Sequence, residues 1–180
     1  GRRRNGHGVV LVLGIDPGTA VTGYGVVRGE RLGVATLIEC GVIRTRPREP
    51  LAQRLLEIYE GVSELIRTHQ PDALAVEDVF YAHNVRTTVV LGHARGVILL
   101  AGQQAGIDIV EYPPAVIKKA VVGNGAATKT QVQFMLTRLL RLKSVPTPSD
   151  AADGVAAALT CVMSSRVPSI AAITTPLGRS

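Results

Sequence analysis

The chain has 180 residues, of which 46% are hydrophobic and 19% charged, a composition typical of one globular domain with its own core. Its two cysteines, Cys40 and Cys161, stand far apart and outside any CxxC or Cys/His cluster. This excludes a disulfide scaffold and a zinc site, and we expect the reducing conditions of a cytoplasm. The net charge of +6 favours a polyanionic partner, while the longest apolar runs fall short of the roughly 18 residues that span a membrane.

The first half of the chain predicts mainly strands. Residues 9–15 are continuously apolar and β-branched, which indicates a strand buried on both faces of a sheet. Two further strands follow, joined by a hairpin-type turn at 28–32, and then a loop and a helix whose apolar residues recur on one face. We expect the strands at 23–27 and 33–44, the loop at 45–50 and the helix at 51–69.

The second half alternates strands and helices. A short buried strand at 73–77 precedes a long helix at 84–105, and the expected elements after it are a strand at 107–111 and helices at 115–122, 129–142 and 148–164. A strand meander followed by α/β crossovers predicts a mixed sheet with helices on its faces. We expect one domain over 9–164, a basic arm at 1–8 and a loose tail at 165–180.

Positive charge is concentrated in one part of the chain. Between residues 112 and 149 there is no acidic residue, and the basic ones are Lys118, Lys119, Lys129, Arg138, Arg141 and Lys143. Such a segment is either a solvated helical face or a platform for a phosphate backbone. Soluble surfaces usually mix the two signs of charge, so the segregation favours the phosphate platform.

Four acidic residues stand out by their positions. Asp16 ends the most apolar strand, and Glu77 ends the strand at 73–77. If these strands are adjacent and parallel, both carboxylates lie at the same edge of the sheet, where ligands of α/β proteins gather. Asp150 and Asp153 are three residues apart, so they face the same side of the last helix.

Carboxylates on such apolar elements need a partner, because an isolated buried charge is costly. Oxygen-only ligation favours Mg²⁺ or Mn²⁺, and two such ions can hold the attacking and leaving oxygens of a phosphodiester displacement. Each acid also has an ordinary interpretation: Asp16 as part of a turn, Glu77 as a polar residue leaving a strand, and Asp150 and Asp153 as caps of a helix N-terminus. Their occurrence together with a cationic segment favours a metal-dependent nuclease.

The sequence resembles the RuvC family of Holliday junction resolvases. The resemblance extends over residues 9–161 and depends on several motifs in order: LGIDPGT at 13–19 with TGYGV at 22–26, AVEDVF at 75–80, LGHARGV at 91–97, VGNGAATK at 122–129 and DAADG at 150–154. The first motif alone is weak, since many RNase H-like ATPases share it. The full set at this spacing is specific.

The resemblance implies an RNase H-like α/β fold with a mixed five-stranded sheet flanked by helices. It implies a homodimer that cuts two strands of a four-way DNA junction symmetrically, leaving 5′-phosphate and 3′-hydroxyl ends. Asp16, Glu77, Asp150 and Asp153 match the family's four metal-binding catalytic acids, with two Mg²⁺ or Mn²⁺ ions per active site. A bacterial cytoplasmic location and a RuvA–RuvB branch-migration partner are further expectations from the family.

The resemblance also assigns DNA contacts. Phe80 matches an aromatic that stacks on a base near the crossover, and its alternative role is that of a core aromatic. Lys118 and Lys129 match basic residues near the scissile phosphates, where Lys129 would neutralise developing charge. Lys119 is a further DNA-binding candidate, although Lys118 and Lys119 could also serve only solubility. The chain departs from the family where a basic residue is expected and His83 stands; Arg86 is its candidate substitute.

Gly92 and Gly96 lie one helical turn apart in the helix at 84–105. They permit close packing, either of this helix against the sheet or, as the resemblance implies, of two subunits against each other. Three other functions remain open at this point: an actin-like or sugar-kinase ATPase, a DNA-binding module without catalysis, and an RNase H-like nuclease acting on another branched or hybrid substrate.

Overall fold

The computed structural model describes residues 9–30, 33–78 and 84–164. The elements follow the predicted order: β1 (Val10–Asp16), β2 (Val21–Gly29), β3 (Ala35–Arg44), α1 (Leu51–His69), β4 (Ala73–Glu77), α2 (Val85–Ala105), β5 (Asp108–Tyr112), α3 (Pro114–Val122), α4 (Lys129–Leu139) and α5 (Ser149–Ser164). None of the helices in these residues is long and apolar enough to cross a membrane.

Within the described residues the strands form one mixed five-stranded sheet in the order β3-β2-β1-β4-β5. The pairs β1/β2 and β2/β3 are antiparallel, as expected of a meander, whereas β4 pairs with β1 and β5 in parallel. The prediction of a mixed sheet is therefore confirmed. The hydrophobic strand β1 lies at the centre of the sheet, and the side chains of Val12, Leu13 and Ile15 are fully buried.

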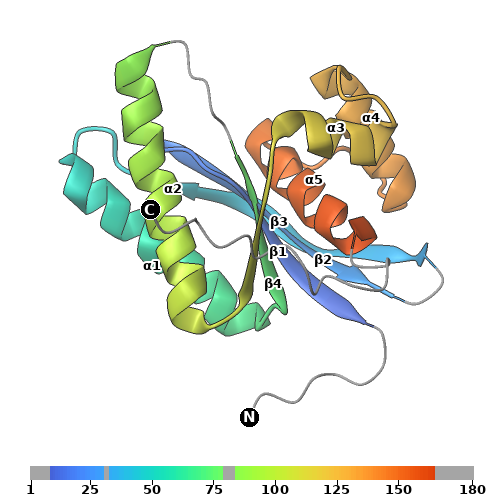
Figure 1. Ribbon diagram of the computed structural model, residues 1–180, viewed down its shortest axis with the longest axis horizontal. Helices are drawn as coiled ribbons and strands as arrows, with labels where there is room; N and C mark the ends of the chain where they lie inside the picture. Colours follow the sequence, from blue (N-terminus) through green and yellow to red (C-terminus); the bar gives the residue numbers. More distant parts are fainter. Residues whose placement is uncertain (1–8, 31–32, 79–83, 165–180) are drawn as a thin grey trace, which may run out of the picture.

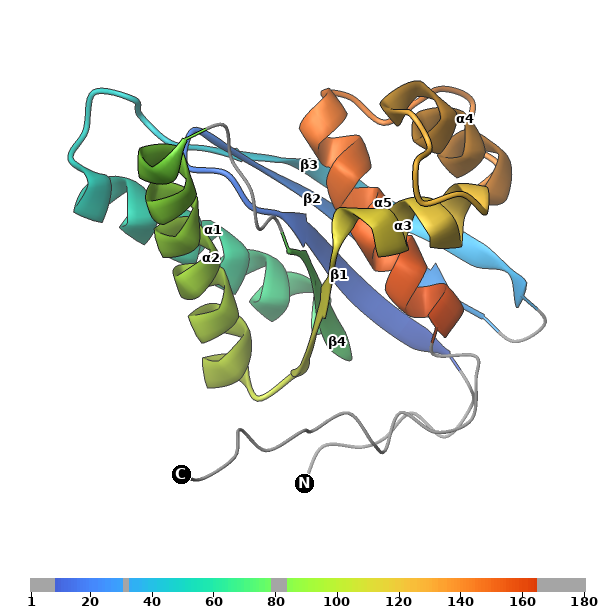
Figure 2. The same cartoon turned by 45° about the horizontal axis from the view of Figure 1, so that its top comes forward.

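Helices cover both faces of the sheet (Figure 1). Helices α1 and α2 lie on one face, and α5 with α3 and α4 beside it lies on the other, an arrangement that the second view in Figure 2 confirms. Two hydrophobic clusters result, because successive side chains of a strand point to opposite faces. On β4, for example, Ala73 and Ala75 pack on the α5 side, while Leu74 and Val76 pack on the α1/α2 side.

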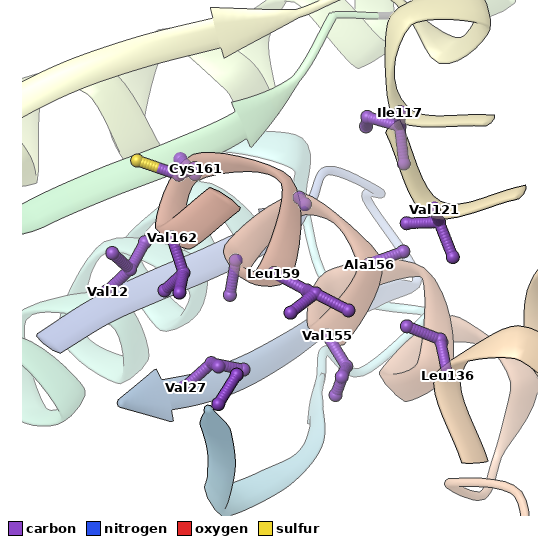
Figure 3. Packing of buried hydrophobic residues seen from close by; sticks show 14 of the residues in the cluster. Val12, Val27, Ile117, Val121, Leu136, Val155, Ala156, Leu159, Cys161 and Val162 are labelled. Atoms are coloured by element: carbon purple, nitrogen blue, oxygen red, sulfur yellow. The ribbon is translucent and has the colours of Figure 1, made fainter. Parts of the chain in front are cut away.

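Helix α5 is the most deeply buried of the helices in the described residues. Eleven of its 16 residues are buried, and its side chains Val155, Leu159 and Val162 lie over Val12 of β1 and Val27 of β2 (Figure 3). Helices α3 and α4 complete this layer through residues such as Ile117 and Leu136, which pack into the same cluster. The alanine-rich sequence of the helix suits this position, because small side chains let it approach the sheet closely.

Glycines bring α5 still closer to the strands. A Cβ atom at Gly14 would lie 2.2 Å from the carbonyl oxygen of Gly154, and one at Gly23 would lie 1.8 Å from that of Asp150. A Cβ at Gly25 would likewise lie 2.6 Å from the Cα of Val155. Because the obstacles are backbone atoms, no side-chain rearrangement could relieve the overlap. Backbone contact between the helix and strands β1 and β2 is thus a requirement of the fold.

Two expectations from the sequence need correction. The helix predicted at 129–142 ends at Leu139, because Arg141 takes a left-handed backbone conformation with φ 54° that stops the helix. Packing of Gly92 and Gly96 against the sheet is wrong: both residues are exposed, and a Cβ at either would meet nothing within 4 Å. These glycines lie on the outer side of α2.

We expect Gly14→Ala to destabilise the protein strongly. The added methyl overlaps the backbone of α5, and overpacking of a core typically costs about 1–3 kcal/mol or more. Urea unfolding of both proteins measures the difference. The matched control is Gly61→Ala on α1, where the Cβ meets only side-chain atoms of Ile43 and the helix propensity of alanine offsets part of the cost. Equal stability of Gly14→Ala and the wild type would contradict the required backbone contact.

Candidate active site

Strands β1 and β4 place two acids next to each other. The parallel register pairs Ile15 with Val76, so that Asp16 and Glu77 end neighbouring strands at the same edge of the sheet. The alternation of side chains along each strand directs both carboxylates toward the α5 face. The predicted adjacency of these two strands is confirmed.

The N-terminal turn of α5 brings the second pair of acids to the same edge. The Asp150 carbonyl stands against Gly23 of β2, the partner of Asp16 in the β1/β2 ladder. Asp150 and Asp153 both act electrostatically on Asp16, and Asp153 also acts on Glu77. The four acids predicted from the sequence therefore lie in one electrostatic group, although they come from three elements.

Burial and mutual repulsion disfavour the ionised form of these acids. The pKa of Asp16 is raised to about 9, first by burial and then by the Glu77, Asp153 and Asp150 carboxylates. A hydrogen bond joins the Asp16 and Glu77 carboxyl groups; it raises the pKa of Asp16 and lowers that of Glu77. Burial also raises the pKa of Glu77, against the opposing effects of that hydrogen bond and of Lys129 and Lys118.

Two of the predicted lysines lie at this group of acids. Lys129 is the first residue of α4, and its Nζ forms an ion pair of 2.8 Å with Oδ2 of Asp153. Thr128 and Gln131 fix the start of this helix through a reciprocal capping box. The pKa of Lys129 is raised, chiefly by its hydrogen bond with Asp153. Lys118, on α3, acts electrostatically on Glu77.

The other predicted contacts lie farther out or outside the described residues. Lys119 is exposed on α3, and Arg86 is exposed in the first turn of α2. Asn84 caps that turn by accepting a hydrogen bond of 2.8 Å from the Thr87 N–H. Phe80 and His83 lie outside the residues that the structure describes, so their predicted roles stay predictions.

The acids fit a hard divalent cation by their chemistry. The donors are carboxylate oxygens without sulfur or imidazole, and the carboxylates of Glu77, Asp153 and Asp150 add to burial in raising the pKa of Asp16. Across the described part of the chain, no group of three or more His, Cys, Asp or Glu side chains forms a closed set of metal ligands. The chemistry of the four acids therefore fits a hard cation, while their side chains do not surround a single point.

Two features of this edge were not expected from the sequence. One is the contact of Gly14, Gly23 and Gly25 with α5; its signal was the spacing of two residues between Gly23 and Gly25 within a strand. The other is an ion pair, 3.1 Å long, between the buried Asp78 and the partly exposed Arg95. Both residues belong to the motifs quoted above, and no local pattern shows that they meet.

The architecture is that of the RNase H-like fold, with an acidic site at the carboxyl ends of its two central parallel strands. The family model for crossover junction endodeoxyribonuclease RuvC matches residues 12–161. The chain belongs to this family, as the resemblance of its motifs indicated.

Curated and solved relatives agree with this assignment. The crossover junction endodeoxyribonuclease RuvC of Pelotomaculum thermopropionicum is 47% identical over 152 residues, which cover 83% of this chain and 91% of the relative. The structure of Thermus thermophilus RuvC has a TM-score of 0.81 and 37% identity, covering 87% of this chain and 95% of that one. T. thermophilus RuvC in complex with Holliday junction substrate has a TM-score of 0.83 and 36% identity over the same shares.

We expect Asp16→Asn to stabilise the metal-free protein at alkaline pH. Because the pKa of Asp16 is raised from 3.8 to about 9, ionisation opposes folding, and the wild type loses stability as the pH rises through this interval. The variant lacks this loss, so its advantage in melting temperature should be small near pH 4 and largest near pH 9. Each kcal/mol of relieved repulsion corresponds to about 2–4 °C.

Thermal unfolding in excess EDTA across this pH range measures the effect. Asp108→Asn, at an exposed position of β5, is the control and should leave the melting temperature unchanged at every pH. A variant Asp16→Asn that melts below the wild type at pH 8 to 9 would contradict the repulsion.

Proposed function

We propose that this protein is a Holliday junction resolvase, a metal-dependent endonuclease that cuts two strands of a four-way DNA junction. The observation that carries the proposal is the group formed by Asp16, Glu77, Asp150 and Asp153, with Lys129 ion-paired at its border. Membership of the RuvC family supports it, as does the similarity to a T. thermophilus protein solved with a Holliday junction substrate. Gathering four acids together is energetically unfavourable, and a DNA-binding module without catalysis would not require such a group.

In the proposed mechanism the four carboxylates would hold two divalent cations, Mg²⁺ or Mn²⁺. The bound ions supply Lewis-acid chemistry for in-line hydrolysis of the phosphodiester, giving 5′-phosphate and 3′-hydroxyl ends. Asp16 interacts electrostatically with Glu77 and with the two acids of α5, which supports a role for it in holding the cations. The Lys129 ammonium, next to Asp153, is placed to neutralise charge that develops on the scissile phosphate.

The DNA is proposed to lie over the α3/α4 side of this edge. The segment from 112 to 149 carries six basic residues and no acid, and it forms the end of β5, helices α3 and α4 and the connection to α5. Lys118 and Lys119 on α3 and Lys129 on α4 would contact the backbone next to the cut, where counterion release contributes to binding. Stacking by Phe80 and a junction contact by Arg86 remain part of the proposal.

The protein is proposed to act as a homodimer through α2. An apolar stripe runs along the outer side of this helix, formed by Val85, Val89, Gly92, Gly96 and Leu100. Val85 is 80% exposed, which is unfavourable for a valine unless a partner covers it. The two glycines leave open space in which a second α2 could approach, and two-fold symmetry would supply paired sites for two cuts. We also propose that the protein acts together with a RuvA–RuvB branch-migration complex in a bacterial cytoplasm.

The nuclease assignment predicts cleavage of a labelled four-way junction with Mg²⁺ and none with EDTA. Asp16→Asn should bind the junction with wild-type affinity and lose cleavage by at least about 10³-fold, because it removes a carboxylate needed by both cations. Gel assays on a panel of junction, flap, duplex and RNA–DNA hybrid substrates measure both properties. Preferential cleavage of the hybrid would instead support an RNase H-like nuclease with another substrate, and ATP hydrolysis without DNA would support an ATPase.

The α2 stripe predicts that Val89→Glu produces a monomer. A carboxylate in the centre of an apolar interface would be desolvated without a partner, so two chains of 19.0 kDa should separate. Size-exclusion chromatography with light scattering measures the mass. Leu56→Glu, at a comparably exposed apolar position on α1, serves as the control and should not change it. A wild type that is monomeric under these conditions would rule out this interface.

A further inference from the structure

A second acid stands directly beside the catalytic edge and points to the other face of the sheet. Glu77 ends β4 on the α5 side with the other carboxylates, so the next side chain, that of Asp78, turns toward α2. The Asp78 side chain is only 9% exposed. Its backbone N–H donates a hydrogen bond of 2.8 Å to the Tyr112 carbonyl and so extends the β4/β5 ladder by one residue.

Arg95 of α2 compensates this buried charge. Its Nη1 lies 3.1 Å from Oδ1 of Asp78, and its Nη2 forms an ion pair with Glu111 of β5. One guanidinium therefore connects three elements: the end of β4, strand β5 and helix α2. A lysine has a single charged nitrogen and could not bridge the two carboxylates with the same fixed geometry.

The pair with Asp78 depends on charge more than on hydrogen bonding. Among the described residues, Asp78 Oδ1 and Arg95 Nε are buried atoms without a hydrogen-bond partner. Removing the guanidinium would leave an uncompensated carboxylate in this buried place, which is unfavourable. A movement of the backbone at Asp78 would relieve this charge by bringing the carboxylate toward water, and the same backbone carries Glu77.

We infer that Arg95 is a positioning residue for the active site. By holding Asp78 and Glu111 on the α2 side, it fixes the end of β4 and thereby the direction in which the Glu77 carboxylate points on the α5 side. Arg95 itself touches none of the four acids, and its effect on metal binding and cleavage passes through the backbone of residues 77–78. The inference rests on the proposed function for its catalytic part and on the geometry of β4 for its metal-binding part.

The first test measures binding of Mn²⁺ to the protein alone by calorimetry. Arg95→Gln should weaken the affinity about fivefold or more, because Glu77 is no longer held in place. The Mn²⁺ affinity of Arg95→Lys should lie between those of Arg95→Gln and the wild type, because lysine keeps the positive charge but cannot bridge Asp78 and Glu111. Arg67→Gln removes an exposed arginine that pairs with Glu64 on α1 and is the matched control with unchanged affinity.

The second test follows junction cleavage at a temperature where each variant is fully folded. For Arg95→Gln we expect kcat to fall at least about tenfold at a fixed Mg²⁺ concentration, while the dissociation constant for the junction changes less than twofold. Asp78→Asn should reduce kcat less than Arg95→Gln, because it removes the buried charge together with the pair. The double variant Asp78→Asn with Arg95→Gln should then recover part of the loss, as two residues of one network do.

The outcomes separate the two ideas. Unchanged Mn²⁺ affinity and kcat in folded Arg95→Gln would overturn the positioning role. The positioning role would also be overturned if kcat and Mn²⁺ affinity fell only in proportion to a lowered melting temperature. It would equally be overturned if the reduction of kcat in the double variant were the product of the reductions in the two single variants. A wild type that binds Mn²⁺ and cuts no junction would overturn the proposed substrate, whereas the effect of Arg95→Gln on Mn²⁺ affinity would still test the positioning role.

Discussion

The site depends on one packing constraint, the contact of α5 with the backbones of β1 and β2. Gly14 and Gly23 leave no room for a side chain between strand and helix, so the helix lies closer to the sheet than ordinary side-chain packing permits. This contact determines the position of the first turn of α5 relative to strands β1 and β2. With larger residues at these positions, Asp150 and Asp153 would be displaced outward, and the carboxylates on β1 and β4 would face apolar side chains or water instead of two further acids.

The same contact makes the acids unfavourable for the fold. Burial under a closely packed helix, together with the three neighbouring carboxylates, raises the pKa of Asp16 to about 9, so the fold disfavours the ionised form of this acid. The cationic segment offsets part of the negative charge at this site. Lys129 forms an ion pair with Asp153, and Lys118 interacts electrostatically with Glu77. A binding site for cations commonly has this imbalance, because a site that is fully compensated in advance would gain little from binding one.

Local patterns in the sequence determined most of the fold. The bounds of α1 and β4 could be predicted from periodicity and apolar runs, and the four acids from their places at strand and helix ends. The end of α4 was predicted too late, because Leu140 and Leu142 continue an apolar pattern although Arg141 breaks the helix. The contact between Gly23 and Asp150, and the pair of Asp78 with Arg95, join residues far apart in the chain. No local signal specifies such contacts; they follow only from the docking of whole elements.

The two consecutive acids at the end of β4 point toward the helix layers on opposite faces of the sheet. Glu77 joins the acids on the α5 side, and Asp78 joins Arg95 on the α2 side, because successive side chains alternate across the sheet. A movement of α2 would therefore displace Glu77 through Arg95, although Arg95 contacts none of the four candidate acids. Since the apolar stripe of α2 is also the proposed contact between subunits, the geometry of one active site would depend on the packing of the dimer. A nuclease that must make two matched cuts would benefit from such a dependence, because a chain without its partner would hold Glu77 less firmly.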